Sequence, residues 1–127
     1  MGYIVANLMT YTTPQDAFAI TVALFSDFGL RANFEPGFPG LEECYYIFFK
    51  LIQKYLPKVY DHLDKEDVLP MMFCSQWFMT AFANDFSLDI VVRIWDVYFV
   101  EGRKTLFRIG LTILQLNQDE ILRKPFE

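Results

Sequence analysis

The chain has 127 residues, which is enough for one domain with a buried core and too short for two. Its hydrophobic fraction of 54% supports such a core, and its aromatic fraction of 18% is high for a domain of this size. The net charge of −5 and the lack of a basic run argue against nucleic acid as a partner.

Neither a secretory signal nor a transmembrane segment is predicted. The N-terminus lacks the basic segment that opens a signal peptide. The longest uncharged run, residues 68–84, is shorter than the roughly 20 apolar residues that span a bilayer, and it contains polar side chains. Cys44 and Cys74 lie in apolar helical patterns and are interpreted as reduced core thiols. We therefore expect a cytoplasmic protein.

The first helix is expected over residues 1–12, where Ile4, Leu8 and Tyr11 repeat at helical spacing. No capping residue precedes it, and a chain that starts directly in an apolar helix has the appearance of a segment of a longer domain. An ordinary start codon before a docked helix is the alternative. We therefore expect further residues of the same domain before Met1.

The second helix is expected to start at Thr13, a capping residue followed by proline, and to end near Gly29. Phe18, Val22 and Phe25 form an apolar row along it. The loop that follows is rich in proline and glycine and should run over the surface.

The next two helices are expected over residues 41–56 and 58–67, separated by Pro57. The first has a strong apolar stripe, and the second is short and charged. The last helix of the chain is expected over residues 103–122. With no alternating apolar and polar strand of useful length, the chain is predicted to be all-α.

The centre of the domain is expected in residues 69–107, which hold both tryptophans. An almost uniformly apolar helix is predicted over residues 75–84 and should be buried on most sides. An amphipathic helix follows, with Ser87 as its N-cap and Gly102 ending it. Its apolar face is predicted to carry Leu88, Val91, Val92, Trp95, Tyr98 and Phe99, and its polar face Asp89, Arg93 and Asp96.

No catalytic group, metal site or cofactor site is predicted from the residues themselves. One histidine, His62, and two separate cysteines do not make a zinc site. A nucleophilic pair of Cys74 and His62 is disfavoured, because an apolar helix raises the pKa of a thiol and leaves it inert. The sequence also lacks the glycine-rich loops that bind phosphate.

Several short motifs occur in a specific order. PGL at residues 39–41 and LPKVYDHL at residues 56–63 precede two tryptophan motifs and an EG pair. The tryptophan motifs are SQWF (Ser75, Gln76, Trp77, Phe78) and RIWD (Arg93, Ile94, Trp95, Asp96), and the pair ends at Gly102. Together they resemble the C-terminal part of a TBC domain, the catalytic domain of GTPase-activating proteins for Rab GTPases.

The resemblance implies a multi-helix orthogonal bundle of about six to seven helices, like the C-terminal subdomain of a TBC domain. It also implies a Rab-type small GTPase as partner, and a place in vesicle trafficking, peripheral to endomembranes. TBC domains use an arginine in an IxxDxxR motif and a glutamine in a YxQ motif to accelerate GTP hydrolysis. Neither motif occurs in this chain. Residues 1–127 are therefore expected to be a partial domain that lacks its N-terminal portion and is inactive alone.

The motif residues themselves are expected to be structural. Trp77, Phe78 and Trp95 at helical spacing are typical of a packed core. Arg93 has Asp89 and Asp96 within helical reach, which predicts an ion-pair cluster and not an arginine finger. Arg108 is likewise not expected to act as a finger.

Gln76 is the one residue here that is a candidate for contact with a GTPase, although a hydrogen-bonded core amide is the favoured interpretation. For the whole chain, the main alternative to a GTPase-activating domain is a non-catalytic helical scaffold that binds a small GTPase or an adaptor. An unrelated interaction module with chance motif matches is disfavoured by the order of the motifs.

Overall fold

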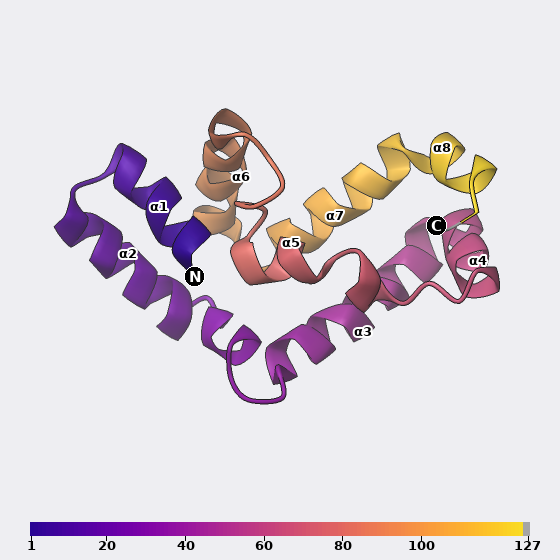
Figure 1. Ribbon diagram of the computed structural model, residues 1–127, viewed down its shortest axis with the longest axis horizontal. Coiled ribbons are helices and arrows are strands. Elements are labelled where there is room, and N and C mark those ends of the chain that lie inside the picture. Colours follow the sequence, from indigo (N-terminus) through magenta and orange to yellow (C-terminus); the bar gives the residue numbers. More distant parts are fainter. Residues whose placement is uncertain (126–127) are drawn as a thin grey trace.

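The computed structural model describes residues 1–125, which form eight α-helices and two short 3-10 helices, η1 and η2, with no β-strand in that range (Figure 1). The all-α prediction is confirmed. The elements are α1 (Gly2–Tyr11), α2 (Pro14–Ser26), η1 (Leu30–Asn33), α3 (Pro39–Tyr55), α4 (Pro57–Lys65), η2 (Pro70–Met72), α5 (Ser75–Thr80), α6 (Leu88–Glu101), α7 (Lys104–Leu116) and α8 (Gln118–Arg123).

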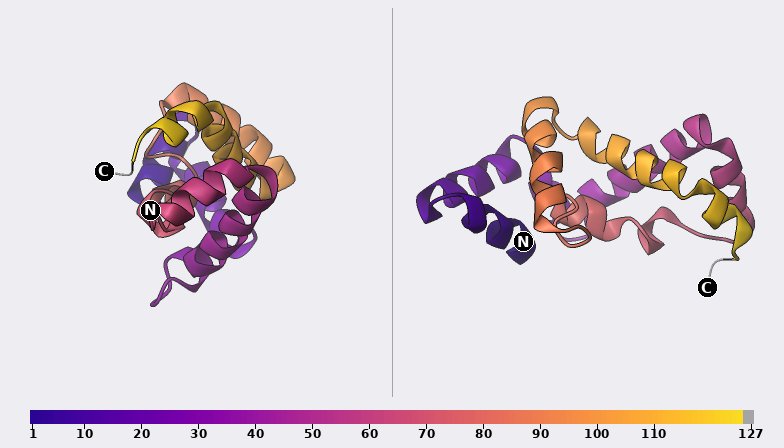
Figure 2. Two further views of the ribbon diagram at one scale, coloured as in Figure 1. Left: turned by 90° about the vertical axis from the view of Figure 1, so that its right-hand side faces the viewer. Right: turned by 90° about the horizontal axis from the view of Figure 1, so that it is seen from above.

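The molecule is elongated, with a pair of contacting helices at each end. Figures 1 and 2 show the α1–α2 hairpin at one end, α4 with α8 at the other, and α5 and α6 between them. The long helices α3 and α7 run in the same direction along the molecule, since Arg103 pairs with Glu43 near their starts and Phe107 packs against Phe48 further along. This pair joins the two ends.

The core is centred on the aromatic ring of Phe48 in α3, which is fully buried. Trp77 and Phe78 of α5 meet this ring edge-on, with ring centroids 6.1 and 5.6 Å away. Phe107 of α7 completes the contact at 6.5 Å. Edge-to-face aromatic pairs of this kind stabilise a core by about 0.5–1.5 kcal/mol each beyond the area that they bury.

Two glycines allow α3 to approach its neighbours closely. Gly110 of α7 lies against Phe48, and a Cβ atom there would be 2.9 Å from the ring. Gly40, at the start of α3, lies against η1, and a Cβ atom there would be 2.7 Å from the backbone of Ala32 and 2.4 Å from the side-chain oxygen of Asn33. Asn33 is itself buried and donates to the Phe78 carbonyl at 3.1 Å, so it ties η1 to α5.

The helix expected over residues 75–84 is shorter than the sequence predicts. It ends at Thr80, because Ala81 and Phe82 have left-handed backbone angles with φ of 48° and 65°. The turn buries the Phe82 ring beside Trp77, at a centroid distance of 5.6 Å. Left-handed angles cost about 1–3 kcal/mol at a residue with a side chain, so tertiary contacts must hold this turn.

Trp95 of α6 supplies one of those contacts. Its indole N–H donates to the Ala81 carbonyl at 2.9 Å, and its ring is buried. The predicted faces of α6 are confirmed in large part: Val91, Trp95 and Tyr98 point inward, and the predicted polar residues are exposed. Ser87 occupies the N-cap position but makes no side-chain capping hydrogen bond, contrary to expectation.

The helix expected over residues 103–122 is divided at Asn117 into α7 and α8. The Asn117 side chain donates to the Ile113 carbonyl at 2.8 Å, and such a side-chain bond competes with the backbone ladder of a helix. The second helix also differs at its end, where Asp27 and not Gly29 is the C-cap. Thr13 caps that helix as predicted, since its hydroxyl accepts from the Asp16 N–H.

The two cysteines are buried and free, as the sequence predicts. Burial raises the pKa of the Cys74 thiol to about 12, and this thiol donates to the Pro70 carbonyl at 2.9 Å. Burial also raises the pKa of the Cys44 thiol. In the part of the chain that the structure describes, no helix has both the length and the apolar character to span a bilayer.

The contact between α3 and η1 leads to a first prediction. Gly40→Ala should lower the free energy of unfolding by about 1–3 kcal/mol, because rigid backbone atoms of Ala32 and Asn33 cannot move aside for the methyl group. Gly2→Ala is the control, since no atom lies within 4 Å of a Cβ atom at Gly2. Urea unfolding measures both variants, and equal stabilities would show that the Gly40 contact is not tight.

A second prediction concerns α6. Trp95→Ala should destabilise the domain by about 3–5 kcal/mol through lost burial and a cavity. Asp96→Ala, at the exposed neighbour, should change stability by no more than about 0.5 kcal/mol. Trp95→Phe separates the hydrogen bond to Ala81 from the packing of the ring. Comparable urea midpoints for the two alanine variants would mean that the helix faces are assigned wrongly.

Candidate partner-binding surface

The SQWF motif forms most of α5, and its side chains point in different directions. Phe78 is fully buried and Trp77 is half-buried against Phe48 and Phe73. The Ser75 hydroxyl donates to the Met71 carbonyl at 2.6 Å and lies 2.7 Å from the Tyr45 hydroxyl. Three of the four motif residues thus fasten α5 to its neighbours.

Gln76 is the exception in this motif. Its side chain is exposed and makes no hydrogen bond among residues 1–125, so the interpretation of Gln76 as a hydrogen-bonded core amide is wrong. An exposed amide can donate and accept hydrogen bonds to a partner. Gln76 stays the candidate contact residue of the motif.

The RIWD motif lies in the second turn of α6 and beyond, and it too divides by face. Ile94 and Trp95 are buried, whereas Arg93 and Asp96 are exposed. The predicted ion-pair cluster around Arg93 is wrong, because the salt bridges of residues 1–125 do not include this residue. Side chains on an exposed helix face gain little from pairing with charges and stay solvated.

Arg103 and Arg108 are the arginines of this region that do form ion pairs. Arg103 lies 3.2 Å from Glu43 of α3, and Arg108 pairs with Glu101. Gly102, between the two helices, has a φ of 82° and ends α6 as expected. These pairs lie at the surface, so they fix the turn between α6 and α7 more than they stabilise the fold.

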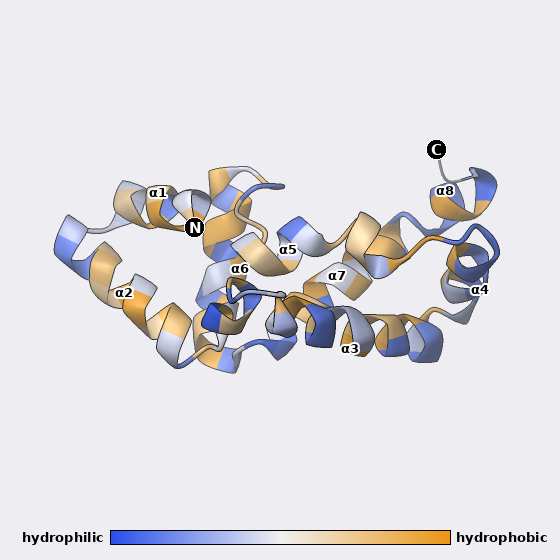
Figure 3. Ribbon diagram, turned by 60° about the horizontal axis from the view of Figure 1, so that its bottom comes forward, coloured by the Kyte–Doolittle hydropathy of each residue, from blue (hydrophilic) through white to orange (hydrophobic). Residues whose placement is uncertain are grey.

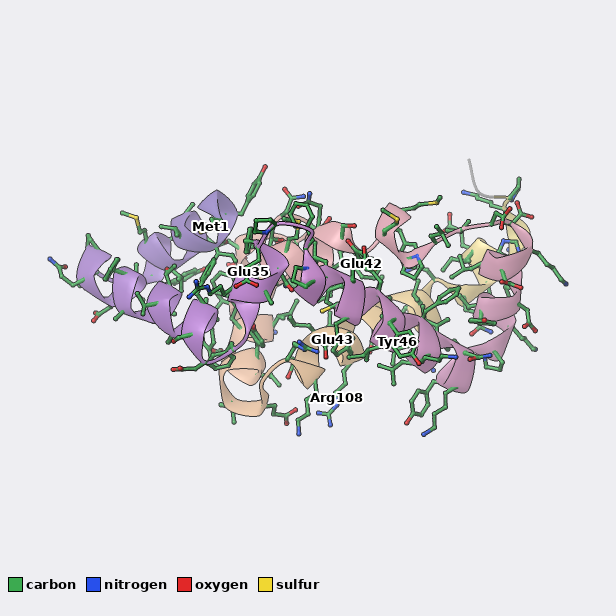
Figure 4. The ribbon with its side chains drawn as sticks, turned by 90° about the horizontal axis from the view of Figure 1, so that it is seen from below. Met1, Glu35, Glu42, Glu43, Tyr46 and Arg108 are labelled. Atoms are coloured by element: carbon green, nitrogen blue, oxygen red, sulfur yellow. The ribbon has the colours of Figure 1, made fainter. Side chains whose placement is uncertain are left out.

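An apolar surface lies on the α1–α2 hairpin, and we call it the N-terminal apolar surface. Phe18 and Val22 are 72% and 49% exposed, and they are one helical turn apart on α2. Met1, Val22 and the half-buried Phe25 line one open pocket of about 340 Å³. Figure 3 shows hydrophobic residues along this hairpin, and Figure 4 places Met1 beside it.

Phe18 and Val22 belong to the apolar row predicted for this helix, but the sequence does not show that these two residues face outward. Ala17 and Leu24 are the buried residues of α2 instead. Large exposed apolar groups gathered on one side of a helix mark a surface that meets another protein segment.

No site for chemistry is found beside this surface. Among residues 1–125, no group of three or more His, Cys, Asp and Glu side chains is placed to hold a metal ion. His62 and Cys74 bond to different backbone carbonyls, those of Lys124 and Pro70. The candidate site is the N-terminal apolar surface, whose exposed Phe18 and Val22 suit contact with another protein segment.

The chain is similar to a known protein family over nearly its whole length. The family model described as Rab-GTPase-TBC domain matches residues 1–122. The human ecotropic viral integration site 5 protein homolog is 36% identical over 126 residues, which is 99% of this chain and 16% of the relative. The GTPase-activating protein GYP5 of Saccharomyces cerevisiae is 34% identical over 128 residues, covering 100% of this chain and 14% of the relative.

A more distant relative, mouse TBC1 domain family member 4, is 26% identical over 122 residues, or 96% of this chain and 9% of its own length. The chain thus spans only a small part of the length of each of these relatives. Nearly all of the chain matches the family model. The order of the motifs, the all-helical fold and this match agree. The chain belongs to the Rab-GTPase-TBC domain family.

Proposed function

We propose that this chain is the C-terminal portion of a domain that stimulates GTP hydrolysis by a Rab GTPase in membrane traffic. The match of residues 1–122 to the family model carries the proposal. The yeast relative GYP5 is a GTPase-activating protein, and this similarity supports the direction of the activity. The whole protein works in the cytoplasm, peripheral to endomembranes.

The groups that accelerate hydrolysis come from the N-terminal portion of the same domain. Phosphoryl transfer is accelerated by positioning and by cationic stabilisation, and an arginine finger contributes roughly 10³–10⁵ in rate. The chain contains neither the IxxDxxR motif nor the YxQ motif of the family. Of its own arginines near the motifs, Arg108 is held by Glu101, and Arg93 projects from the outer face of α6.

The N-terminal apolar surface is where that missing portion packs. Phe18 and Val22 expose apolar area that a soluble monomer normally covers. Both residues lie on the α1–α2 hairpin at one end of the molecule, and α3, α5 and α7 lie outside this hairpin (Figure 1). These three helices would support the hairpin to which the additional helices bind. The chain would then supply the platform, and the preceding portion the catalytic side chains.

Gln76 is the residue of the described part that we assign to contact with the GTPase. It is exposed in a motif whose other three side chains pack or form hydrogen bonds inside the protein. An unused amide in the first turn of α5 can pair with backbone groups of a partner. The buried residues around it hold that turn in place.

A third prediction follows for activity. The 127-residue chain should leave the GTP hydrolysis rate of every Rab at its intrinsic value, because it lacks both finger motifs. Single-turnover phosphate release across a panel of Rab GTPases measures this. Stimulation by about tenfold or more would show that the chain holds catalytic groups of its own.

The control is a longer chain that includes the preceding residues of the same protein. It should stimulate hydrolysis, lose about 10³-fold or more when the arginine of an upstream IxxDxxR motif is changed to alanine, and keep its activity with Arg93→Ala. Loss of activity in Arg93→Ala would instead assign the finger to α6. Binding of a Rab by the longer chain without any stimulation would support the non-catalytic scaffold.

A fourth prediction concerns the N-terminal apolar surface. The isolated chain should bind a hydrophobic dye such as ANS and self-associate at micromolar concentration, since Phe18 and Val22 are uncovered. Phe18→Gln together with Val22→Gln should reduce both effects. Leu116→Gln is the matched control, because Leu116 is 80% exposed and is the last residue of α7, next to α8 and away from the α1–α2 hairpin. A dye-silent, monodisperse chain would contradict the proposed packing.

A further inference from the structure

A second surface, remote from the α1–α2 hairpin, is rich in aromatic rings. An open pocket of about 350 Å³ lies where α3, α4 and η2 meet. Tyr45, Tyr46 and Phe49 of α3 and Tyr60 of α4 line it, with Pro70 of η2 at one side. Pockets near the lower end of the usual range of about 300–1,000 Å³ take a few side chains and not a whole helix face.

Most of these rings are held in place before any ligand arrives. The Tyr45 hydroxyl is 2.7 Å from the Ser75 hydroxyl, which in turn bonds the Met71 carbonyl. The Phe49 and Tyr60 rings pack with centroids 4.8 Å apart. Only Tyr46 stands clear of the surface, at 67% exposure. A pre-formed floor reduces the entropy lost when a ligand binds.

The rim of the pocket offers unused hydrogen-bonding groups. Within residues 1–125, the hydroxyls of Tyr46 and Tyr60 and the amide of Gln53 have no hydrogen-bond partner. Glu42 forms no ion pair in that range, although the adjacent Glu43 pairs with Arg103. In Figure 4, Glu42 and Tyr46 are labelled on α3, one turn apart along the same helix.

A cation already lies near one ring. The Lys50 ammonium is 5.8 Å from the centre of the Tyr46 ring. Lys50 itself lines the pocket, as does Glu42, and the two residues are about two helical turns apart on α3. The pocket therefore has a positive end at Lys50 and a negative end at Glu42. The surface therefore combines apolar ring faces, hydrogen-bond donors, one ammonium group and, away from it, one unpaired carboxylate.

We infer that this pocket is a docking site for a proline-rich segment that carries a basic residue beside its prolines. Proline rings pack well on aromatic faces, and a polyproline II backbone is extended and has unpaired carbonyls that accept from donors such as Tyr60 and Gln53. Little entropy is lost, because the segment is already in its bound conformation. The basic residue would pair with Glu42.

This inference does not rest on the proposed GTPase-activating function. The pocket lies on α3, α4 and η2, whereas the proposed contacts with the missing helices lie on α1 and α2. A proline-rich segment of a partner protein bound here would join the domain to that partner without covering the N-terminal apolar surface.

The test is fluorescence anisotropy with the 127-residue chain and a labelled peptide of one arginine followed by eight prolines. Tyr46→Ala should weaken binding by at least about fivefold. Tyr55→Ala is the matched control and should bind unchanged, since Tyr55 is 59% exposed on the same helix, has Lys54 beside its ring and lies outside the pocket. Circular dichroism verifies that both variants fold.

Two further peptides make the result specific. A peptide with glycine and serine in place of the prolines should not bind, and a peptide with glutamate in place of arginine should bind more weakly. Glu42→Gln should remove that difference between arginine and glutamate. Equal binding of the glycine–serine peptide, equal losses in the two tyrosine variants, or tighter binding of an acidic amphipathic helix would overturn the assignment.

Discussion

The packing of the buried Phe48 ring against α5 and α7 is the interaction on which the rest of the fold depends. This ring touches α5 through Trp77 and Phe78 and α7 through Phe107, and it leaves no room for a side chain at Gly110. Because α3 and α7 connect the two ends of an elongated molecule, the ring fixes their spacing along the middle (Figure 1). Closely packed protein interiors have low compressibility, so a shift of one helix in this region would also shift its neighbours.

Helix positions, and the breaks at Pro57 and Gly102, were predictable from the sequence, whereas the interruptions at Ala81 and Asn117 were not. Thr13 caps α2 as local chemistry requires, and α6 buries the face that its periodicity indicates. The turn at Ala81 was hidden, because alanine favours helix and the contacts that hold the left-handed angle, among them the Trp95 indole, come from distant parts of the sequence. The role of Asn33 was equally hidden, since its partner is the Phe78 carbonyl in another element.

The candidate surface was only partly predictable, for a related reason. Apolar periodicity shows that a helix has an apolar face, and it does not show whether that face meets the core or another segment. Phe18 and Val22 point outward, while Ala17 and Leu24 of the same helix are buried. Local charge spacing placed Arg93 in an ion-pair cluster, yet exposed side chains gain too little from pairing to hold that geometry. The motif order identified the family independently of these details.

The left-handed turn after α5 has a consequence for the order in which the chain folds. Its two fasteners are long-range, since Trp95 and Ala81 are 14 residues apart and Asn33 and Phe78 are 45 apart. Until both contacts form, a continuous helix through Ala81 has a lower local free energy than the left-handed turn. We therefore expect this turn to form late in folding, after α6 and η1 have packed against α5. Contacts between residues that are far apart in the sequence are also those that slow folding.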